Sequence, residues 1–352
     1  MKVVYTYFGL MQRVGGVSRY FFEVISRIRK EIKVNVCSFF LSNEYFKTSL
    51  RRIWFSSNNR YIIYLRIIFE EVFQFFYLLL GHYDVIHLTA ERKTPFVWAN
   101  KPIVITIHDM IPELFSMDQK VIERRRFAIK KCSAIICVSE NTKSDLLRLF
   151  PDIPEEKITV IYHGYIPHIT EYREVIDGDY FLYVGTRSAT YKNFKTMLRA
   201  ICPLLKERKI KLVCTGASFN SEELNLIHKL SLDSDVVNVG FVTDETLASL
   251  YHFAICFLYP SLYEGFGIPI LESWYHQCPA CLSNASCFPE IAGDAAVYFD
   301  PNSEEQILNS ATRITTDGSF RSSLISKGNE RLRLFSWDIA ASKTIEVYKK
   351  LS

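Results

Sequence analysis

The sequence has no uninterrupted apolar run long enough to cross a membrane. Its richest apolar stretch, Tyr61 to Gly81, is broken by Arg66, Glu70 and Glu71, and a charge at mid-bilayer is costly. The opening residues MKVVYTYFGLMQRVGG lack the apolar core of a signal peptide. We therefore expect a cytoplasmic protein, either free or peripheral on the inner face of the cytoplasmic membrane.

Other features that the sequence lacks narrow the possible class of protein further. The nine cysteines are scattered without the spacing of a disulfide scaffold, which indicates a reducing compartment. No internal repeat of about 20–50 residues is visible, which disfavours a solenoid. No G-x-G-x-x-G follows the first apolar run, which disfavours a dehydrogenase.

Charge is present but unevenly distributed. Residues 1–165 hold 24 Lys and Arg against 16 Asp and Glu, whereas residues 166–352 hold 18 against 22. The basic half includes the run ERRRFAIKK, from Glu123 to Lys131. This run is either a solvated helix face or a surface for an anionic membrane or lipid-diphosphate partner. No nucleic-acid partner is expected, because the aromatic residues do not alternate with cations as base-stacking platforms do.

The alternation of apolar runs and helical segments predicts two doubly wound α/β domains. The chain has 352 residues, too many for one ordinary core, and its 49% hydrophobic fraction is typical of globular proteins. We expect domains at 1–165 and 166–335, then a C-terminal helix at 336–352 that starts near Ser336. The predicted parallel strands are KVVYTYF, VNVCSFF, YDVIHLT, PIVITIHD, AIICVS and KITVIYHG, then YFLYVGT, IKLVCTG, VVNVGFV, AICFLYP, PACLS and AAVYFD.

Ligands of such sheets bind beyond the carboxyl ends of the strands, so the residues that follow each apolar run are site candidates. In the second half, VGTRSATYKN places Arg187 and Lys192 just before a helix that starts near Asn193. Two cations beside a helix N-terminus form an anion site, because the free N–H groups and the helix dipole add to their charge. The alternative is that both are exposed loop cations.

The stretch SLYEGFGIPILESW contains two carboxylates, Glu264 and Glu272, eight positions apart. Gly265 and Gly267 allow close backbone approach, and Pro269 suits the first turn of a helix that includes Glu272. Carboxylates are acceptors that chelate vicinal hydroxyls, whereas the N–H groups of the turn would bind a phosphate. Alternatively, both are acids favoured at a helix N-terminus by its dipole.

This stretch resembles the E-x7-E signature of retaining glycosyltransferases of family 4, which have the two-domain GT-B fold. GGVSRYFFE, YDVIHLT, ITIHD, VGTRSATYKN, FPEIAGDAAVYFDP and the late FSW occur in that family's order, so the resemblance covers nearly the whole chain. It implies two Rossmann-like domains that face each other across a cleft, with the C-terminal helix returning to the first. It also implies a nucleotide-sugar donor and a saccharide acceptor.

The resemblance further implies roles for individual residues. Arg187 and Lys192 would hold the leaving diphosphate in place of a metal ion, so no metal and no other cofactor is expected. Glu264 would contact the donor sugar, and Glu272 would chelate the ribose. We expect Arg187→Ala to lower turnover without unfolding the protein. The remaining implied contacts are His108 and Asp109 to the sugar, Gly15 and Gly16 to the diphosphate, Gly265, Phe266 and Gly267 to sugar and phosphate, Val242 to the base, and Gly185 and Ile268 to the donor.

GGVSRYFFE with HDMIPE resembles the mannosyltransferase branch, which implies GDP-mannose as donor and a lipid-diphosphate-linked polysaccharide such as O-antigen or capsule as acceptor. The alternatives are a UDP-sugar donor, a nucleotide-sugar epimerase on the same fold, and a catalytically silent membrane scaffold. A zinc site is a further alternative, because H-x-C-x2-C-x5-C occurs at His276, Cys278, Cys281 and Cys287. A buried strand at CPACLS is the competing interpretation.

Overall fold

The structure, a computed structural model, describes residues 1–11, 15–41, 43–46, 53–54, 59–90, 100–115, 118–166 and 171–351. The chain divides into two compact units. Unit 1 comprises Met1–Gly164 together with Ser336–Ser352, and unit 2 comprises Tyr165–Phe335. Both are α/β, as the sequence predicts.

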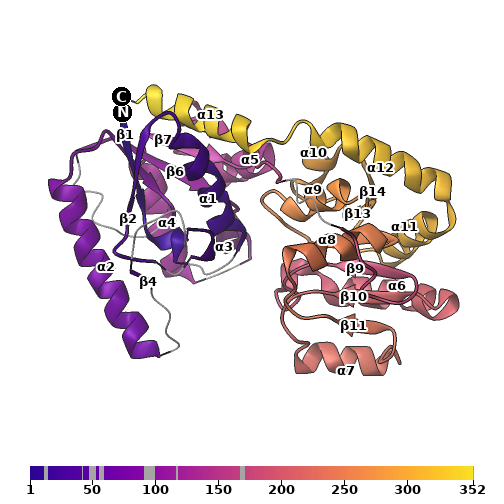
Figure 1. The fold of residues 1–352 in the computed structure, drawn as a ribbon. Coiled ribbons are helices and arrows are strands. Elements are labelled where there is room, and N and C mark those ends of the chain that lie inside the picture. The colour runs from indigo at the N-terminus through magenta and orange to yellow at the C-terminus, as the bar shows by residue number, and fades with distance from the viewer. Residues whose placement is uncertain are drawn as a thin grey trace. The chain divides into compact units, whose positions relative to one another are not determined.

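Unit 1 is built on a six-stranded parallel sheet in the order β2-β1-β5-β6-β7-β8 (Figure 1). The six strands coincide with the six apolar runs predicted in the first half, and the central ones are buried along their whole length because helices cover both faces. Their bounds are β1 Lys2–Thr6, β2 Lys33–Cys37, β5 Val85–Leu88, β6 Ile103–Ile107, β7 Ala134–Cys137 and β8 Ile158–Val160; β3 Phe40–Leu41 pairs separately with β4 Ile53–Trp54.

Two helices of unit 1 begin after a serine that serves as N-cap. Ser139 caps α5 by accepting a hydrogen bond from the Thr142 N–H, and Ser336 caps α13 in the same way through Asp338. The helices are α1 Gly16–Ile28, α2 Arg60–Leu80, α3 Ile111–Leu114, α4 Gln119–Lys131, α5 Glu140–Leu149 and α13 Trp337–Lys349, with 3₁₀ turns at Phe8–Leu10, Glu44–Phe46 and Glu155–Lys157.

The C-terminal helix returns to the first sheet, as expected. It packs along α1 (Figure 1). Its buried Tyr348 hydroxyl lies 2.5 Å from the Tyr5 hydroxyl of β1. The same hydroxyl is hydrogen-bonded to His87 of β5, whose other ring nitrogen lies 2.9 Å from Thr106 Oγ1. Residues almost the whole chain length apart therefore share one core.

The basic run in α4 is not a uniform charged face. Arg125 is buried, with Nε 3.1 Å from Glu113 and Nη2 donating to the carbonyl of Asp109 at 2.6 Å. Arg126 lies over the Phe150 ring, and Lys130 pairs with Asp152. The prediction of a solvated or membrane-facing run is therefore wrong for Arg125, which serves as an internal support for the loop after β6.

Unit 2 contains a second six-stranded parallel sheet, in the order β11-β10-β9-β12-β13-β14. Its strands coincide with the six runs predicted in the second half: β9 Tyr180–Tyr183, β10 Lys211–Cys214, β11 Val236–Asn238, β12 Cys256–Tyr259, β13 Ala280–Ser283 and β14 Ala296–Phe299. The helices are α6 Phe194–Arg208, α7 Ser221–Lys229, α8 Asp244–Phe253, α9 Ile268–Tyr275, α10 Phe288–Ala292, α11 Glu304–Thr316 and α12 Gly318–Leu332, with a 3₁₀ turn at Thr190–Lys192.

The strand order of unit 2 reverses between β9 and β12. The chain proceeds outward from β9 to β10 and β11, then returns to place β12 on the other side of β9. Loops that leave two such neighbouring strands diverge to opposite sides and leave room for a ligand at their carboxyl ends. The candidate residues after β9 and β12 are therefore placed at the switch point of the sheet.

Candidate functional site

The loops after β9 and β12 are tied together at this switch point. The Leu262 N–H donates to the Tyr191 carbonyl at 2.7 Å, which aligns the 3₁₀ turn after β9 with the loop after β12. Lys192 Nζ then donates to Glu264 Oε1 at 2.6 Å, and the two side chains keep 17% and 12% of their surface exposed. Two residues that the sequence marks separately thus form one ion pair at the edge of the sheet.

Serine and tyrosine side chains hold the Glu264 carboxylate in place. Ser261 Oγ donates to the same Oε1 at 2.7 Å, and the Glu264 N–H donates to Ser286 Oγ at 3.0 Å. Burial, together with the negative charge of Glu264, raises the pKa of the Tyr259 hydroxyl well above 10. Sequence reasoning missed Tyr259 and Ser286 as supporting residues, whereas Ser261 stands three positions before Glu264 in the stretch that the sequence marks.

The second carboxylate lies on α9. The helix starts after Gly267, whose φ of +92° favours glycine, and Pro269 occupies its first turn as predicted. The Tyr251 hydroxyl donates to Glu272 Oε2 at 3.3 Å. Ile268 is half-buried at the start of the helix, and Phe266 is buried against Phe335.

A row of glycines marks the carboxyl ends of β9, β10 and β11. Gly185, Gly216 and Gly240 have φ of +107°, +98° and +74°, and the Gly216 N–H donates to the Gly240 carbonyl at 2.8 Å. A Cβ added at Gly185 or Gly240 would meet no atom within 4 Å, so the backbone there is open to approach. Half-buried Val242 follows, beside a Phe241 ring that is 89% exposed.

Arg187 is placed differently from the expectation of a loop cation. It is buried, and its guanidinium donates to the Thr215 carbonyl at 2.9 Å and to the Ala217 carbonyl. Its Nε lies 3.6 Å from Glu223 Oε1, and the Phe219 ring lies 4.7 Å from its guanidinium carbon. The structure therefore directs Arg187 to the loop after β10 and pairs Lys192, not Arg187, with Glu264.

The candidates of unit 1 gather around the start of α1 and the end of β6. Gly15 is the N-cap of α1, and a Cβ on Gly16 would meet no atom within 4 Å. One turn later, the Tyr20 ring packs edge-on against His108, with centroids 4.9 Å apart. Burial, and then the nearby Arg125, lower the pKa of His108 to about 3, so the imidazole is neutral. Asp109 Oδ1 accepts the Ile111 N–H at 3.0 Å.

The residues considered for a metal site do not form one. Cys278, Cys281 and Cys287 are buried, and burial raises the pKa of each thiol. Among the residues that the structure describes, no group of three or more His, Cys, Asp or Glu side chains is arranged to hold a metal ion. Two Asp-x-Asp tripeptides, 177–179 and 233–235, lie before β9 and β11, at the end of the sheet away from Glu264.

Comparison with known families accounts for both units. The family model described as "Glycosyl transferases group 1" matches residues 170–331, and the model "Glycosyltransferase Family 4" matches residues 14–168. O-antigen chain mannosyltransferase B of Escherichia coli is 30% identical over 270 residues, covering 70% of each chain. An uncharacterized glycosyltransferase of Methanocaldococcus jannaschii is 30% identical over 297 residues, covering 76% of this chain and 75% of that protein.

Solved structures agree on the fold. An Anabaena protein, HepE, solved in complex with UDP and glucose, superimposes with a TM-score of 0.77 at 17% identity, covering 100% of both chains. WaaG, a glycosyltransferase involved in lipopolysaccharide biosynthesis, gives a TM-score of 0.74 at 15% identity over the same coverage. The fold is GT-B, with two Rossmann-like domains. The chain belongs to the glycosyltransferases, with a first unit that matches the family 4 model and a second unit that matches the group 1 model.

Proposed function

We propose that the protein is a retaining mannosyltransferase that needs no metal ion and transfers mannose from GDP-mannose to a growing, lipid-diphosphate-linked surface polysaccharide. The observation that carries this proposal is the Lys192–Glu264 pair at the switch point of unit 2. An ammonium group has three N–H donors, and the bond to Glu264 uses one. The other two remain for a diphosphate.

The proposed reaction breaks the bond between the anomeric carbon and the diphosphate oxygen. Positive charge develops on the sugar ring and negative charge on the diphosphate, so a fixed cation beside the leaving group stabilises the transition state. The acceptor hydroxyl attacks from the face that the diphosphate leaves, forming the new glycosidic bond, and its proton passes to the departing diphosphate. Glu264 positions the sugar and does not act as a nucleophile.

Other residues complete the proposed donor site. Arg187 has five N–H donors and gives two to carbonyl oxygens, and the proposed diphosphate contact would use one of the others. Only 2% of its side chain is exposed, so that contact requires the side chain to move. Glu272 chelates the ribose, and the open backbone at Gly185 admits the diphosphate. The further proposed contacts are those of Gly265, Phe266, Gly267 and Ile268 to sugar and phosphate, of Val242 to the base, and of Gly15, Gly16, His108 and Asp109 from unit 1.

The names of several relatives support mannose as the donor sugar. Besides the Escherichia coli protein, the O-antigen chain mannosyltransferase RfbU of Salmonella typhimurium is 28% identical over 205 residues, 57% of each chain. The acceptor we propose follows from the O-antigen in these names, and it places the enzyme at the cytoplasmic face of the membrane. A UDP-sugar donor is the second candidate, because the Anabaena structure contains UDP.

Ligand-dependent thermal stability tests the donor. A ligand at a hundred times its dissociation constant stabilises the folded state by about 2.7 kcal/mol. We expect stabilisation by GDP and GDP-mannose, unchanged by EDTA, and none by UDP or UDP-hexoses. Stabilisation by UDP alone would indicate a UDP-sugar donor in place of GDP-mannose. Loss of stabilisation in EDTA would overturn the metal-free mechanism. Nucleotide release without any acceptor would instead indicate the epimerase.

The Lys192→Gln variant tests the pair that carries the proposal. Removing one preorganised electrostatic contact typically lowers kcat by about 10²–10³. We expect such a loss of turnover with little change in the unfolding midpoint, because partly exposed ion pairs contribute about 0–1 kcal/mol. The control is Lys195→Gln, which breaks an exposed pair with Glu222 and should keep full turnover. Full activity of Lys192→Gln would show that Lys192 has no role in the mechanism.

A further inference from the structure

Helix α2 buries three polar side chains and exposes most of its large apolar ones, unlike a helix that packs on a core through its apolar face. Arg66, Glu70 and Gln74, four residues apart, face inward and are at most 7% exposed. Glu70 Oε1 accepts hydrogen bonds from the Phe40 N–H at 2.8 Å and from Ser38 Oγ at 3.0 Å. Polar contacts with Ser38 and with Phe40 of β3 therefore help to hold α2 in place, alongside the buried Leu78.

The outward face of α2 is apolar along its whole length. These side chains recur at the three- and four-residue spacing of one helix face, and each is between 44% and 82% exposed. Single exposed apolar residues are normal, but a continuous row marks an interaction surface. The row consists of Tyr61, Tyr64, Leu65, Ile68, Phe69, Val72, Phe76, Leu79 and Leu80, and Phe39 extends it by contacting Phe69.

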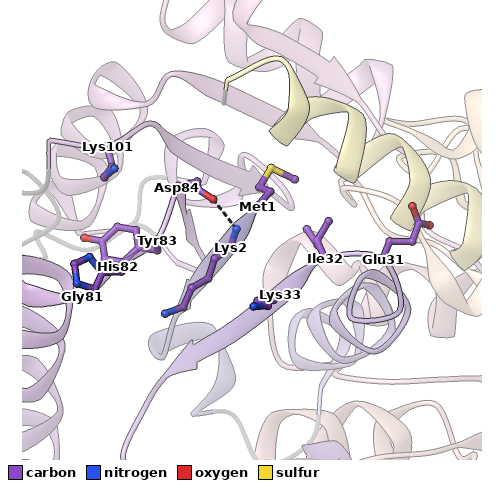
Figure 2. A pocket seen from close by; sticks show the side chains of 10 residues that line it. All are labelled: Met1, Lys2, Glu31, Ile32, Lys33, Gly81, His82, Tyr83, Asp84 and Lys101. Atoms are coloured by element: carbon purple, nitrogen blue, oxygen red, sulfur yellow. Dashed lines mark hydrogen bonds between the residues drawn. The ribbon is translucent and has the colours of Figure 1, made fainter.

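A basic hollow adjoins the C-terminal end of this helix. It has a volume of about 610 Å³ and is lined by Gly81 and His82, which follow α2, and by Lys2, Lys33 and Lys101 (Figure 2). A neighbouring hollow adds Arg29 and Lys30, so five cations face two carboxylates, Glu31 and Asp84. Apolar surface and positive charge therefore meet at one end of unit 1.

We propose that the outward face of α2 lies in the interface of an anionic lipid bilayer, with the basic hollow against the headgroups. None of the described helices combines the length and hydropathy that spanning a bilayer requires, so α2 would lie in the interface plane. Tyr61 and Tyr64 are of the type enriched at membrane interfaces. Each cation near an acidic leaflet adds to the attraction between protein and membrane.

Charge favours lipid over a second copy of this chain. A twofold dimer that pairs the α2 helices in parallel would bring the like-charged hollows together, and one that pairs them antiparallel would leave both hollows outside the contact. An anionic surface instead attracts them. The inference rests on the proposed membrane setting but not on the identity of the donor sugar.

Sedimentation with vesicles tests this surface in the full-length protein. We expect binding to an equal mixture of phosphatidylcholine and phosphatidylglycerol, weakened by salt, and much less to phosphatidylcholine alone. Leu65→Gln with Val72→Gln should reduce binding at least tenfold, and so should Lys33→Glu with Lys101→Glu. The matched controls lie on unit 2 or α13: Leu224→Gln with Ile339→Gln, and Lys206→Glu with Lys229→Glu, each expected to bind as the wild type does.

The double variant Arg124→Ser with Arg126→Ser tests whether the basic run of α4 also contacts the membrane. We expect it to bind vesicles as the wild type does. Vesicle binding that survives the α2 variants would overturn the proposal. A dimer in analytical ultracentrifugation that the same α2 variants dissociate would identify a second copy as the occupant. Stabilisation by GDP is measured in parallel. If the protein fails to bind vesicles but is stabilised by GDP, the membrane surface is wrong and the proposed donor is unaffected. If it binds vesicles but is not stabilised by GDP, the proposed donor is wrong and the membrane surface is unaffected.

Discussion

At the scale of single residues, Arg187 joins parts of unit 2 that lie far apart in the sequence. It connects the loop after β9 to two carbonyl groups after β10 and to Glu223 on α7. Glu223 also accepts the Asn220 N–H at 2.9 Å in the capping box of α7. A residue that the sequence marks only for donor binding therefore also supports the fold of the donor-binding unit.

We predict that Arg187→Ala destabilises unit 2 as well as lowering turnover. Removing one partner of a buried ion pair leaves an uncompensated charge and typically costs about 3–5 kcal/mol. Urea unfolding measures this loss, and Arg187→Met combined with Glu223→Gln should recover much of it because no buried charge remains. An Arg187→Ala protein with the wild-type unfolding midpoint would contradict the structural role and favour the original expectation of a purely functional one.

At the scale of elements, the docking of α13 depends on a histidine kept neutral in the core. Burial, and then the neighbouring His108, lower the pKa of His87 from 6.5 to about 3. The ring contacts Tyr348 of α13 on one side and Thr106 of β6 on the other. Protonation of His87 would place a positive charge where three elements meet.

We predict that stability falls as the pH is lowered below about 6.5. Between pH 6.5 and 3 the unfolded chain binds a proton at His87 and the native protein does not, so acid favours unfolding. The contribution of one such histidine is about 1.4 kcal/mol per pH unit within that window. Urea unfolding from pH 7.5 downward, in intervals of about one unit, measures it.

The His87→Gln variant should show a shallower dependence on pH, although it is less stable at neutral pH. His228→Gln is the matched control, because that side chain is 85% exposed on α7 and should leave the dependence unchanged. Identical slopes for His87→Gln and the wild type would show that His87 does not remain neutral in the native state.

At the scale of the whole molecule, the last helix belongs to the first unit. It buries Trp337, Ile345 and Tyr348 in unit 1. Burying one large apolar side chain contributes about 1.5–3 kcal/mol, and whole domains are stable by only about 5–15 kcal/mol. Residues at the end of the chain therefore decide whether the first unit folds.

We predict that a protein ending at Phe335 loses the folding transition of unit 1 but keeps that of unit 2. Differential scanning calorimetry should show one transition, and GDP should still raise its midpoint if unit 2 binds the donor. A truncated protein with both transitions at their wild-type temperatures would show that α13 adds little to unit 1. Tyr348→Phe, which removes only a hydroxyl, serves as the milder comparison.

Local patterns in the sequence determined much of this protein. All twelve strands of the two large sheets coincide with apolar runs, and Ser336 and Pro269 mark the helix starts where expected. These features follow from side-chain periodicity and from hydrogen bonds within a few residues, so they can be read without tertiary structure. The family motifs could be read in the same way, because they are short and contiguous.

Only the tertiary structure decided which side chains meet. Lys192 and Glu264 are 72 positions apart, and they pair because the strand order places β12 beside β9. The burial of Arg187 and Arg125 and the outward turn of the apolar face of α2 are decided in the same way. Amphipathic spacing shows that a helix has an apolar face, but which face turns inward depends on the polar groups that distant segments present to it.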